Sequence, residues 1–294
     1  MHFKLPTTAD PTAGKFSARA RFKILVRSLA VAVLFSTALQ TQMHAESVLI
    51  DYNFNSLTNS TALAGQDDWI NFSSAGNAGP VVRSFTPTGL SAQQGAGWST
   101  SGTGSAARAY REFDNFNLTT GFTVTIEFDL VRVGANAQAL LGIGSAAAPA
   151  AVPATVGTFS TSGWVIRSIG EGTSASALDG NGNAIVPTQN NLYRVRSVWD
   201  LGAATGSLAV MNLSAGETAF TPLYFNAAQT QSTVSFGTLG DVTQWNDLLV
   251  RTGGFNQTAG GFLDNVYVTA VPEPSVVALL AGAAAVLLLA RRRK

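Results

Sequence analysis

The stretch Phe122–Leu130, FTVTIEFDL, decides the fold class of this 294-residue chain. Apolar side chains at every second position alternate with Thr, Glu and Asp, which is the period of a strand with one buried and one solvent-facing side. Further strand candidates recur on both sides of it, separated by turn residues: 47–54, 139–143, 163–169, 192–199, 207–213, 233–236 and 261–268. No segment between residues 46 and 271 shows a sustained 3.6-residue period with helix caps. We therefore expect a mainly β fold, an antiparallel two-sheet sandwich over residues 46–271 that forms a single ectodomain.

Residues 1–45 have the layout of a bacterial secretory signal peptide. A basic region between Lys15 and Arg27 precedes a mostly apolar run from Leu29 to Leu39, and the small Ala45 offers a cleavage point before Glu46. An uncleaved amphipathic anchor is the alternative interpretation. In the first case the mature, exported chain begins at Glu46.

The last residues of the chain form three parts in order. They are Pro272, Glu273 and Pro274, then the apolar run 275–290, then the basic residues Arg291, Arg292, Arg293 and Lys294. As a helix the run is about 24 Å long at ~1.5 Å per residue, and snorkelling arginines or local thinning can fit it to a hydrocarbon core of ~30 Å. Four cations at the end favour a cytoplasmic C-terminus. The sequence thus predicts a single transmembrane helix over 275–290, with an ordinary tail anchor as the plainer alternative.

This order of elements after a signal peptide resembles the PEP-CTERM sorting signal, which is read by exosortases in the envelope of Gram-negative bacteria. The resemblance covers residues 272–294. It implies that an exosortase-type membrane processing enzyme recognises the Pro-Glu-Pro tripeptide and removes the tail. It also implies membrane anchoring in the cell envelope before processing, a cell-surface or extracellular location afterwards, and association with exopolysaccharide or biofilm.

The charge of the ectodomain differs from that of the whole chain. Residues 46–271 contain 15 acidic residues, 8 arginines and no lysine, a net charge of about −7, whereas the whole chain has +1 because ten cations lie in its two ends. A domain with this negative net charge lacks the basic surface typical of nucleic-acid-binding proteins, so nucleic acid is not expected as a partner. The chain has no cysteine, and its two histidines, His2 and His44, precede Glu46. Cysteine-ligated metals, histidine bases and Ser-His-Asp triads are therefore excluded from the mature protein.

Several stretches resemble the concanavalin A-like lectin/glucanase (laminin G-like) jelly rolls of exported bacterial proteins. They are 49–54 (LIDYNF), 65–69 (GQDDW), 122–133, 193–200 (YRVRSVWD) and 263–268 (LDNVYV). The likeness spans most of 47–269 and implies a jelly-roll sandwich. It concerns architecture, because this fold hosts lectins as well as enzymes.

Glu127 and Asp129 lie two residues apart and share one strand face, as at the start of the Glu-x-Asp-x-(x)-Glu motif of laminarinase-like members of that superfamily. Those enzymes need a third carboxylate for a nucleophile and acid/base pair about 5 Å apart, but Val131 and Arg132 occupy the place here. We expect a solvated strand face with one Arg–carboxylate pair, and no enzyme activity. The alternative is a polysaccharide-active enzyme, a glycoside hydrolase or lyase, with its acid/base assembled from scattered carboxylates: Asp51, Asp68, Glu112 or Asp264.

Two weaker candidate sites remain. Trp69 beside Asp67 and Asp68, and Trp98 in a Gly/Ser-rich loop, are candidate carbohydrate contacts, against the ordinary role of tryptophan in packing. Asp179, Asn181 and Asn183 begin like a Ca²⁺ loop, but residues 184 and 190 lack the expected Gly and Glu, which favours a hairpin turn. No other cofactor is expected. Together these observations predict a non-catalytic, lectin-like envelope or matrix protein.

Overall fold

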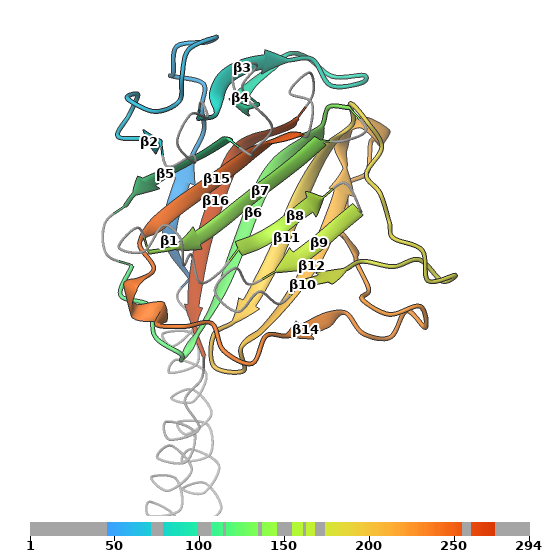
Figure 1. Ribbon diagram of the computed structural model, residues 1–294. Helices are drawn as coiled ribbons and strands as arrows, with labels where there is room; N and C mark the ends of the chain where they lie inside the picture. The colour runs from blue at the N-terminus through green and yellow to red at the C-terminus, as the bar shows by residue number, and fades with distance from the viewer. Residues whose placement is uncertain are drawn as a thin grey trace, which may run out of the picture. The chain divides into compact units, whose positions relative to one another are not determined.

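The computed structural model describes residues 46–71, 79–98, 107–113, 116–134, 137–145, 155–160, 163–167, 174–254 and 260–273. The predicted signal peptide, the apolar run 275–290 and the basic tail lie outside these ranges. Glu46–Pro272 forms one compact unit, in which the strands stack as two layers (Figure 1). Among the described residues, no helix has the length and apolar character needed to cross a membrane.

The larger sheet has nine strands among the described residues, all of them paired antiparallel. β6 (Phe122–Arg132) lies at its centre between β11 (Leu192–Asp200) and β16 (Gly261–Pro272). The remaining strands flank these three: β12 (Thr205–Asn212) pairs with β11, β13 (Thr221–Pro222) and β14 (Thr233–Ser235) with β12, β1 (Ser47–Tyr52) and β4 (Gln93–Gly97) with β16, and β3 (Val81–Phe85) with β4.

The smaller sheet has seven antiparallel strands in the described part of the chain. Their order across the sheet is β10 (Ser174–Ser176), β9 (Gly163–Arg167), β8 (Thr155–Ser160), β7 (Ala137–Gly144), β15 (Asp247–Gly254), β5 (Ala107–Glu112) and β2 (Ile70–Asn71). Helix in the described residues is limited to two 3₁₀ turns, η1 (Leu213–Ala215) and η2 (Val242–Gln244). The predicted mainly β, antiparallel two-sheet fold is confirmed.

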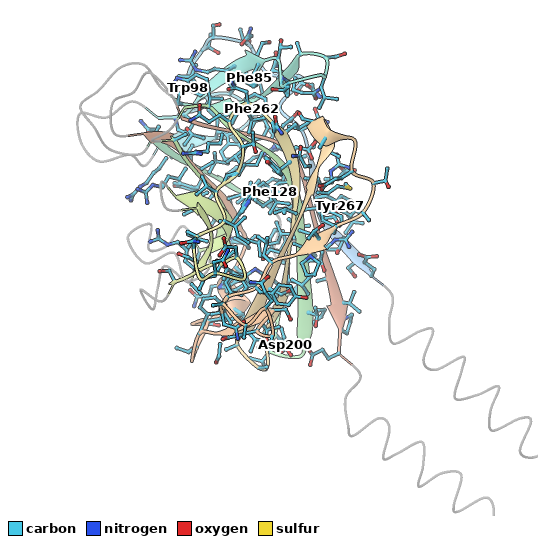
Figure 2. The ribbon with its side chains drawn as sticks, turned by 90° about the vertical axis from the view of Figure 1, so that its right-hand side faces the viewer. Phe85, Trp98, Phe128, Asp200, Phe262 and Tyr267 are labelled. Atoms are coloured by element: carbon cyan, nitrogen blue, oxygen red, sulfur yellow. The ribbon has the colours of Figure 1, made fainter. Side chains whose placement is uncertain are left out.

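The main core lies between the two sheets. The apolar residues of the alternating stretch in β6 supply its centre, with Val124, Ile126, Phe128 and Leu130 each at most 1% exposed. Figure 2 shows Phe128 between the layers. Trp199 is also buried and stacks on Phe236, with ring centroids 5.0 Å apart. Burial of such side chains contributes roughly 1.5–3 kcal/mol each, so the period of two in β6 determines which of its faces is the core face.

A second, smaller apolar cluster lies on the outer face of the larger sheet. Its buried members are Val131, Leu192 and Phe262, and Phe85 packs on Phe262 with ring centroids 6.1 Å apart. The Thr88 N–H also donates to the Asn190 carbonyl, at 2.9 Å. The β3–β4 hairpin, at the top of Figure 1, therefore packs on one end of this outer face.

Candidate functional site

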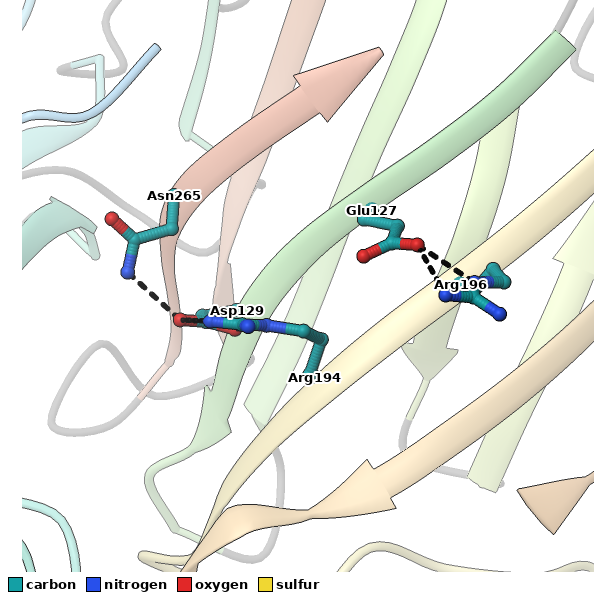
Figure 3. Close-up of polar contacts among 5 residues, drawn as sticks. All are labelled: Glu127, Asp129, Arg194, Arg196 and Asn265. Carbon is teal, nitrogen blue, oxygen red and sulfur yellow. Dashed lines mark hydrogen bonds and ion pairs between the residues drawn. The ribbon is translucent and has the colours of Figure 1, made fainter. Parts of the chain in front are cut away.

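Two arginines and two carboxylates face each other on the outer face of the larger sheet. Glu127 and Asp129 alternate with the core residues of β6, and the β6–β11 register places Arg196 opposite Glu127 and Arg194 opposite Asp129. Figure 3 shows both pairs side by side. Directly opposed residues have Cβ atoms about 4.5–5.5 Å apart, so both ion pairs follow from strand register alone. One such pair was expected from the sequence and two are present, because β11 has an arginine at two successive outward positions.

The Asp129 carboxylate is almost fully enclosed by donors. Arg194 donates Nε–H to Oδ1 at 2.8 Å and Nη2–H to Oδ2 at 3.0 Å, and the Asn265 amide donates to Oδ2 at 2.8 Å. The Asp129 side chain is 3% exposed. The hydrogen bond from Arg194 to Asp129 raises the pKa of the guanidinium. Three N–H donors thus occupy the Asp129 carboxylate, which has little contact with solvent.

Glu127 is more open. Arg196 contacts only one of its oxygens, with Nε and Nη2 both 2.7 Å from Oε1, and the Glu127 side chain is 24% exposed. The other face of the Arg196 guanidinium meets the Phe220 ring, with Cζ 3.9 Å from the centroid. Arg196 is thus fixed between an aromatic ring and a carboxylate, while Glu127 Oε2 accepts no hydrogen bond from the described residues.

Tyr267 completes the site from β16. A β-bulge lies between Asp264 and Tyr267, and beyond it Tyr267 is directly opposite Glu127 on one side and Asp51 of β1 on the other. Tyr267 is 39% exposed, and Figure 2 shows it outside the two layers. Its ring is therefore open to solvent between two carboxylates.

We define the polar row as Asp51, Tyr267, Glu127, Arg196 and Phe220. Its first four members come from the adjacent strands β1, β16, β6 and β11. At ~4.8 Å per strand they extend over about 14 Å, perpendicular to the strands. The row combines one exposed aromatic ring with acceptors on either side of it and a fixed cation, an arrangement that can stack against a flat apolar surface and bind hydroxyl groups around it.

Asp264 is buried on the same outer face, before the bulge. It lies opposite Asp129 and is 1% exposed; its Oδ1 accepts the Phe54 N–H at 3.3 Å, and its Oδ2 has no hydrogen-bond partner among the described residues. Burial raises its pKa from 3.8 to about 6, with the negative charge of Asp129 acting in the same direction. Asp264 is therefore an enclosed carboxyl rather than a solvent-accessible one.

Trp69 is placed differently from its predicted role as a carbohydrate contact. It is 1% exposed, its indole N–H donates to the Tyr52 hydroxyl at 3.0 Å, and its ring packs on Tyr52 and Phe54. A sugar-stacking ring needs an exposed face, so this part of the prediction is corrected: Trp69 belongs to the core. Burial raises the pKa of Tyr52 to about 12.

The acidic neighbours of Trp69 do not form a pocket with it. Asp67 pairs with Arg111 at 2.6 Å, and this guanidinium lies over the Tyr52 ring with Cζ 4.8 Å from the centroid. Asp68 is exposed. Trp98 is half-buried, with the Arg83 guanidinium 4.7 Å from its ring centroid and Arg83 Nε–H donating to the Trp98 carbonyl at 2.7 Å. One face of Trp98 is therefore taken by Arg83.

The Asp179 loop is the hairpin turn favoured above. Asp179 Oδ1 accepts the N–H groups of Asn181 and Asn183 at 2.9 and 2.8 Å, and Leu178 and Ala184 pair across the turn. The pKa of Asp179 is lowered, chiefly by the hydrogen bond from the Asn183 backbone N–H. Its carboxylate is thus used within the turn. No group of three or more His, Cys, Asp or Glu residues able to hold a metal ion occurs in the parts of the chain that are described.

The sorting tripeptide is only partly described. Pro272 ends β16 and pairs with Phe122, and Glu273 follows it outside the strand. Pro274 and the basic residues Arg291, Arg292, Arg293 and Lys294 lie outside the described residues.

Tyr267, Arg196 and Phe220 were not singled out from the sequence. The alternation in 192–199 could have placed Arg194 and Arg196 on one face, but nothing in the sequence gives the register that brings them to Asp129 and Glu127. Phe220 lies outside the strands, and no local signal connects it to Arg196.

No protein-family model matches the chain, and no curated protein matches it. Solved structures to which the chain is similar include lectin II from Ulex europaeus, which is 10% identical with a TM-score of 0.42, the match covering 78% of this chain and 100% of that one. The CBM2 module of an evolved Dit protein of Lactobacillus casei phage J-1 is 10% identical with a TM-score of 0.43, covering 79% and 98%. A GH131 β-glucanase catalytic domain from Podospora anserina is 14% identical with a TM-score of 0.41, covering 76% and 95%. At such identities and scores, function has to be argued from the residues of the site itself.

Proposed function

We propose that the chain is an exported envelope or matrix protein whose sandwich domain binds polysaccharide, without catalysis, along the polar row. The observation that carries this proposal is Tyr267, 39% exposed on a sheet face and set directly between Asp51 and Glu127. Pyranose rings have an apolar face and a rim of hydroxyls. A tyrosine ring flanked by carboxylates matches both features at once.

The carboxylates of β6 support binding rather than hydrolysis. Retaining hydrolysis needs two free carboxyl groups about 5–5.5 Å apart, one acidic and one nucleophilic. Here Asp129 is held by Arg194 and Asn265, and one oxygen of Glu127 is held by Arg196. Held in this way, the two carboxylates are not the pair of free carboxyl groups that retaining hydrolysis needs.

Sorting is the second part of the proposal. It rests on the order of Pro272-Glu273-Pro274, the apolar run 275–290 and the basic tail, together with the predicted signal peptide. Export followed by exosortase-type processing would deliver the sandwich to the cell surface or matrix, where exopolysaccharide is available as a ligand.

Glycan-array binding by the purified full-length chain in mild detergent tests the binding part. Tyr267→Ala should weaken binding to the glycans recognised by wild type about tenfold, as truncation of an exposed anchor in a binding site typically costs more than 1 kcal/mol. Ile70→Ala is the matched control, since Ile70 is 48% exposed but lies on β2 of the smaller sheet. Absence of glycan binding by wild type, or equal effects of the two substitutions, would remove the polar row as the site.

A further inference from the structure

The outer face around the polar row has more negative than positive charge. On strands β1, β16, β6 and β11, two arginines face outward, Arg194 and Arg196. The exposed or half-exposed carboxylates of Asp51, Glu127 and Asp200, together with the buried Asp129 and Asp264, make five outward acids on the same strands. With Asp264 ionised, above about pH 6, these groups sum to a net charge of −3.

Both arginines are already engaged in intramolecular pairs. Arg194 binds both oxygens of Asp129, and Arg196 is fixed between Glu127 and the Phe220 ring. A carboxylate or sulfate on an incoming ligand would have to displace one of these intramolecular partners. Such an exchange returns little free energy, because it replaces one ion pair by another and leaves a protein carboxylate without its cation.

The groups on either side of Tyr267 are hydrogen-bond acceptors. Asp51 is exposed, and Glu127 Oε2 has no donor among the described residues. Ionised carboxylates accept hydrogen bonds and cannot donate them. They therefore suit the hydroxyl groups of a sugar and repel a uronate carboxylate placed against the same ring.

Charge at longer range has the same sign. Residues 46–271 contain 15 acidic residues and 8 arginines, with no lysine. A polyanionic chain therefore meets repulsion as it approaches, as well as at the site.

Building on the proposed polysaccharide-binding function, we infer that the polar row selects uncharged pyranose glycans and rejects those that carry uronate or sulfate groups. The Asp51 carboxylate, which forms no ion pair among the described residues, repels a uronate about 5 Å away by about 1–3 kcal/mol at effective dielectric constants between those of water and a protein surface, which corresponds to roughly a tenfold difference in affinity. Because salt screens this repulsion, the difference in affinity between neutral and charged glycans decreases as ionic strength rises.

Calorimetric titration of the full-length chain in detergent, with neutral β-glucan oligosaccharides and with oligouronates of matched length, tests the inference. Wild type should bind the neutral series at least about tenfold more tightly at 0.05 M salt, with a smaller ratio at roughly 0.5 M. Glu127→Gln should raise oligouronate affinity severalfold by releasing the charge of Arg196. Asp51→Asn should act in the same direction without touching an ion pair, which guards against misfolding of the first variant. Asp68→Asn, exposed and with a backbone φ of 62° that asparagine tolerates, removes the same unit of charge elsewhere and should leave the ratio unchanged.

The outcomes separate the two proposals. If oligouronates bind wild type as tightly as neutral oligosaccharides, the selectivity is refuted while glycan binding stands. The same holds if Asp68→Asn shifts the ratio as much as Glu127→Gln, because the effect would then come from total charge. If neither series binds any variant, the proposed polysaccharide binding fails, and the selectivity fails with it.

Discussion

Replacing Asp264 by Asn should stabilise the protein at neutral pH and not at acidic pH. Asp264 is 1% exposed and faces Asp129, and burial raises its pKa from 3.8 to about 6. A raised carboxyl pKa means that the folded state holds the proton more tightly than the unfolded state does. The contribution of this proton is fully present below about pH 4 and is lost as pH rises toward 6, so above pH 6 the buried charge costs the fold about 3 kcal/mol.

Asparagine removes that cost because it carries no charge at any pH. It keeps an oxygen in place to accept the Phe54 N–H, but its new amide N–H group lies where Asp264 Oδ2 has no partner. An imperfectly satisfied buried amide costs about 1–2 kcal/mol, which leaves a net gain of about 1–2 kcal/mol at pH 7.5. For a domain of this size that gain corresponds to a Tm increase of about 3–6 °C.

Thermal unfolding of wild type, Asp264→Asn and Asp68→Asn, followed by circular dichroism from pH 4 to pH 8, provides the test. The Tm advantage of Asp264→Asn should appear between pH 4 and 6 and then stay constant, while the exposed Asp68→Asn stays within about 0.5 kcal/mol of wild type throughout. A Tm difference that does not change with pH, or a loss of stability at pH 7.5, would refute the assignment of a buried ionising carboxyl.

Three further predictions follow from the ion pairs and the motifs. Arg194→Met should lower the free energy of unfolding, measured in urea, by about 3–5 kcal/mol, because it leaves the buried Asp129 carboxylate without its cation. Arg196→Met should lower it by about 1 kcal/mol or less, because its partner Glu127 is partly exposed. Equal losses would contradict the difference in burial. Purified protein should release no reducing ends from β-glucans, and release that disappears in Glu127→Gln would show that β6 is catalytic after all. In the native host, Glu273→Ala should accumulate an uncleaved membrane-bound form, and intact masses of wild type and variant that both include residues 275–294 would reduce the tripeptide to a helix boundary.

Periodicity predicted the strands that have one covered and one open face, and the candidates 139–143 and 163–169 also proved to be strands, β7 and β9, although these are buried almost throughout. β6, β11 and β16 alternate because the core lies on one side only, and the prediction located all three. β15 was not predicted, because Leu248, Leu249 and Val250 are all buried and all apolar, so its sequence lacks the period of two. β8 begins at Thr155, inside the stretch Ser145–Gly157 that reads as a loop from its Gly, Ala and Pro content. In such segments tertiary pairing overrides local preference.

β4 was missed for a different reason. Its sequence, QQGAG, has no strand signal, but a side chain at Gly95 would clash with the Leu263 carbonyl oxygen of β16. Glycine is therefore required by the closeness of two backbones, a condition that only the folded structure reveals. The β3–β4 hairpin that covers one end of the outer face could not be anticipated from periodicity.

Only part of the candidate site could be predicted from the sequence. Glu127 and Asp129 were identified as neighbours on one face, and their role as paired rather than free carboxylates depends on cross-strand register, which no local pattern encodes. Trp69 was a candidate carbohydrate contact, against a role in packing, because its neighbours are acidic. In the structure Asp67 pairs with Arg111, and the Trp69 indole N–H donates to the Tyr52 hydroxyl. The acidic residues beside Trp69 thus indicated a polar neighbourhood, but not which way the indole ring points.

A single bulge in the closing strand accounts for the position of Tyr267. Leu263 lies in the core, and with strict alternation Tyr267, four residues on, would point inward as well. The extra residue between Asp264 and Tyr267 shifts the pattern by one, so that Val266 and Val268 enter the core and Tyr267 faces outward beside Glu127. Asn265 permits the shift, because it adopts a φ of 49° that asparagine tolerates better than most residues, and its amide then reaches Asp129. The same irregularity therefore brings Asn265 to Asp129 and exposes the aromatic ring of the polar row.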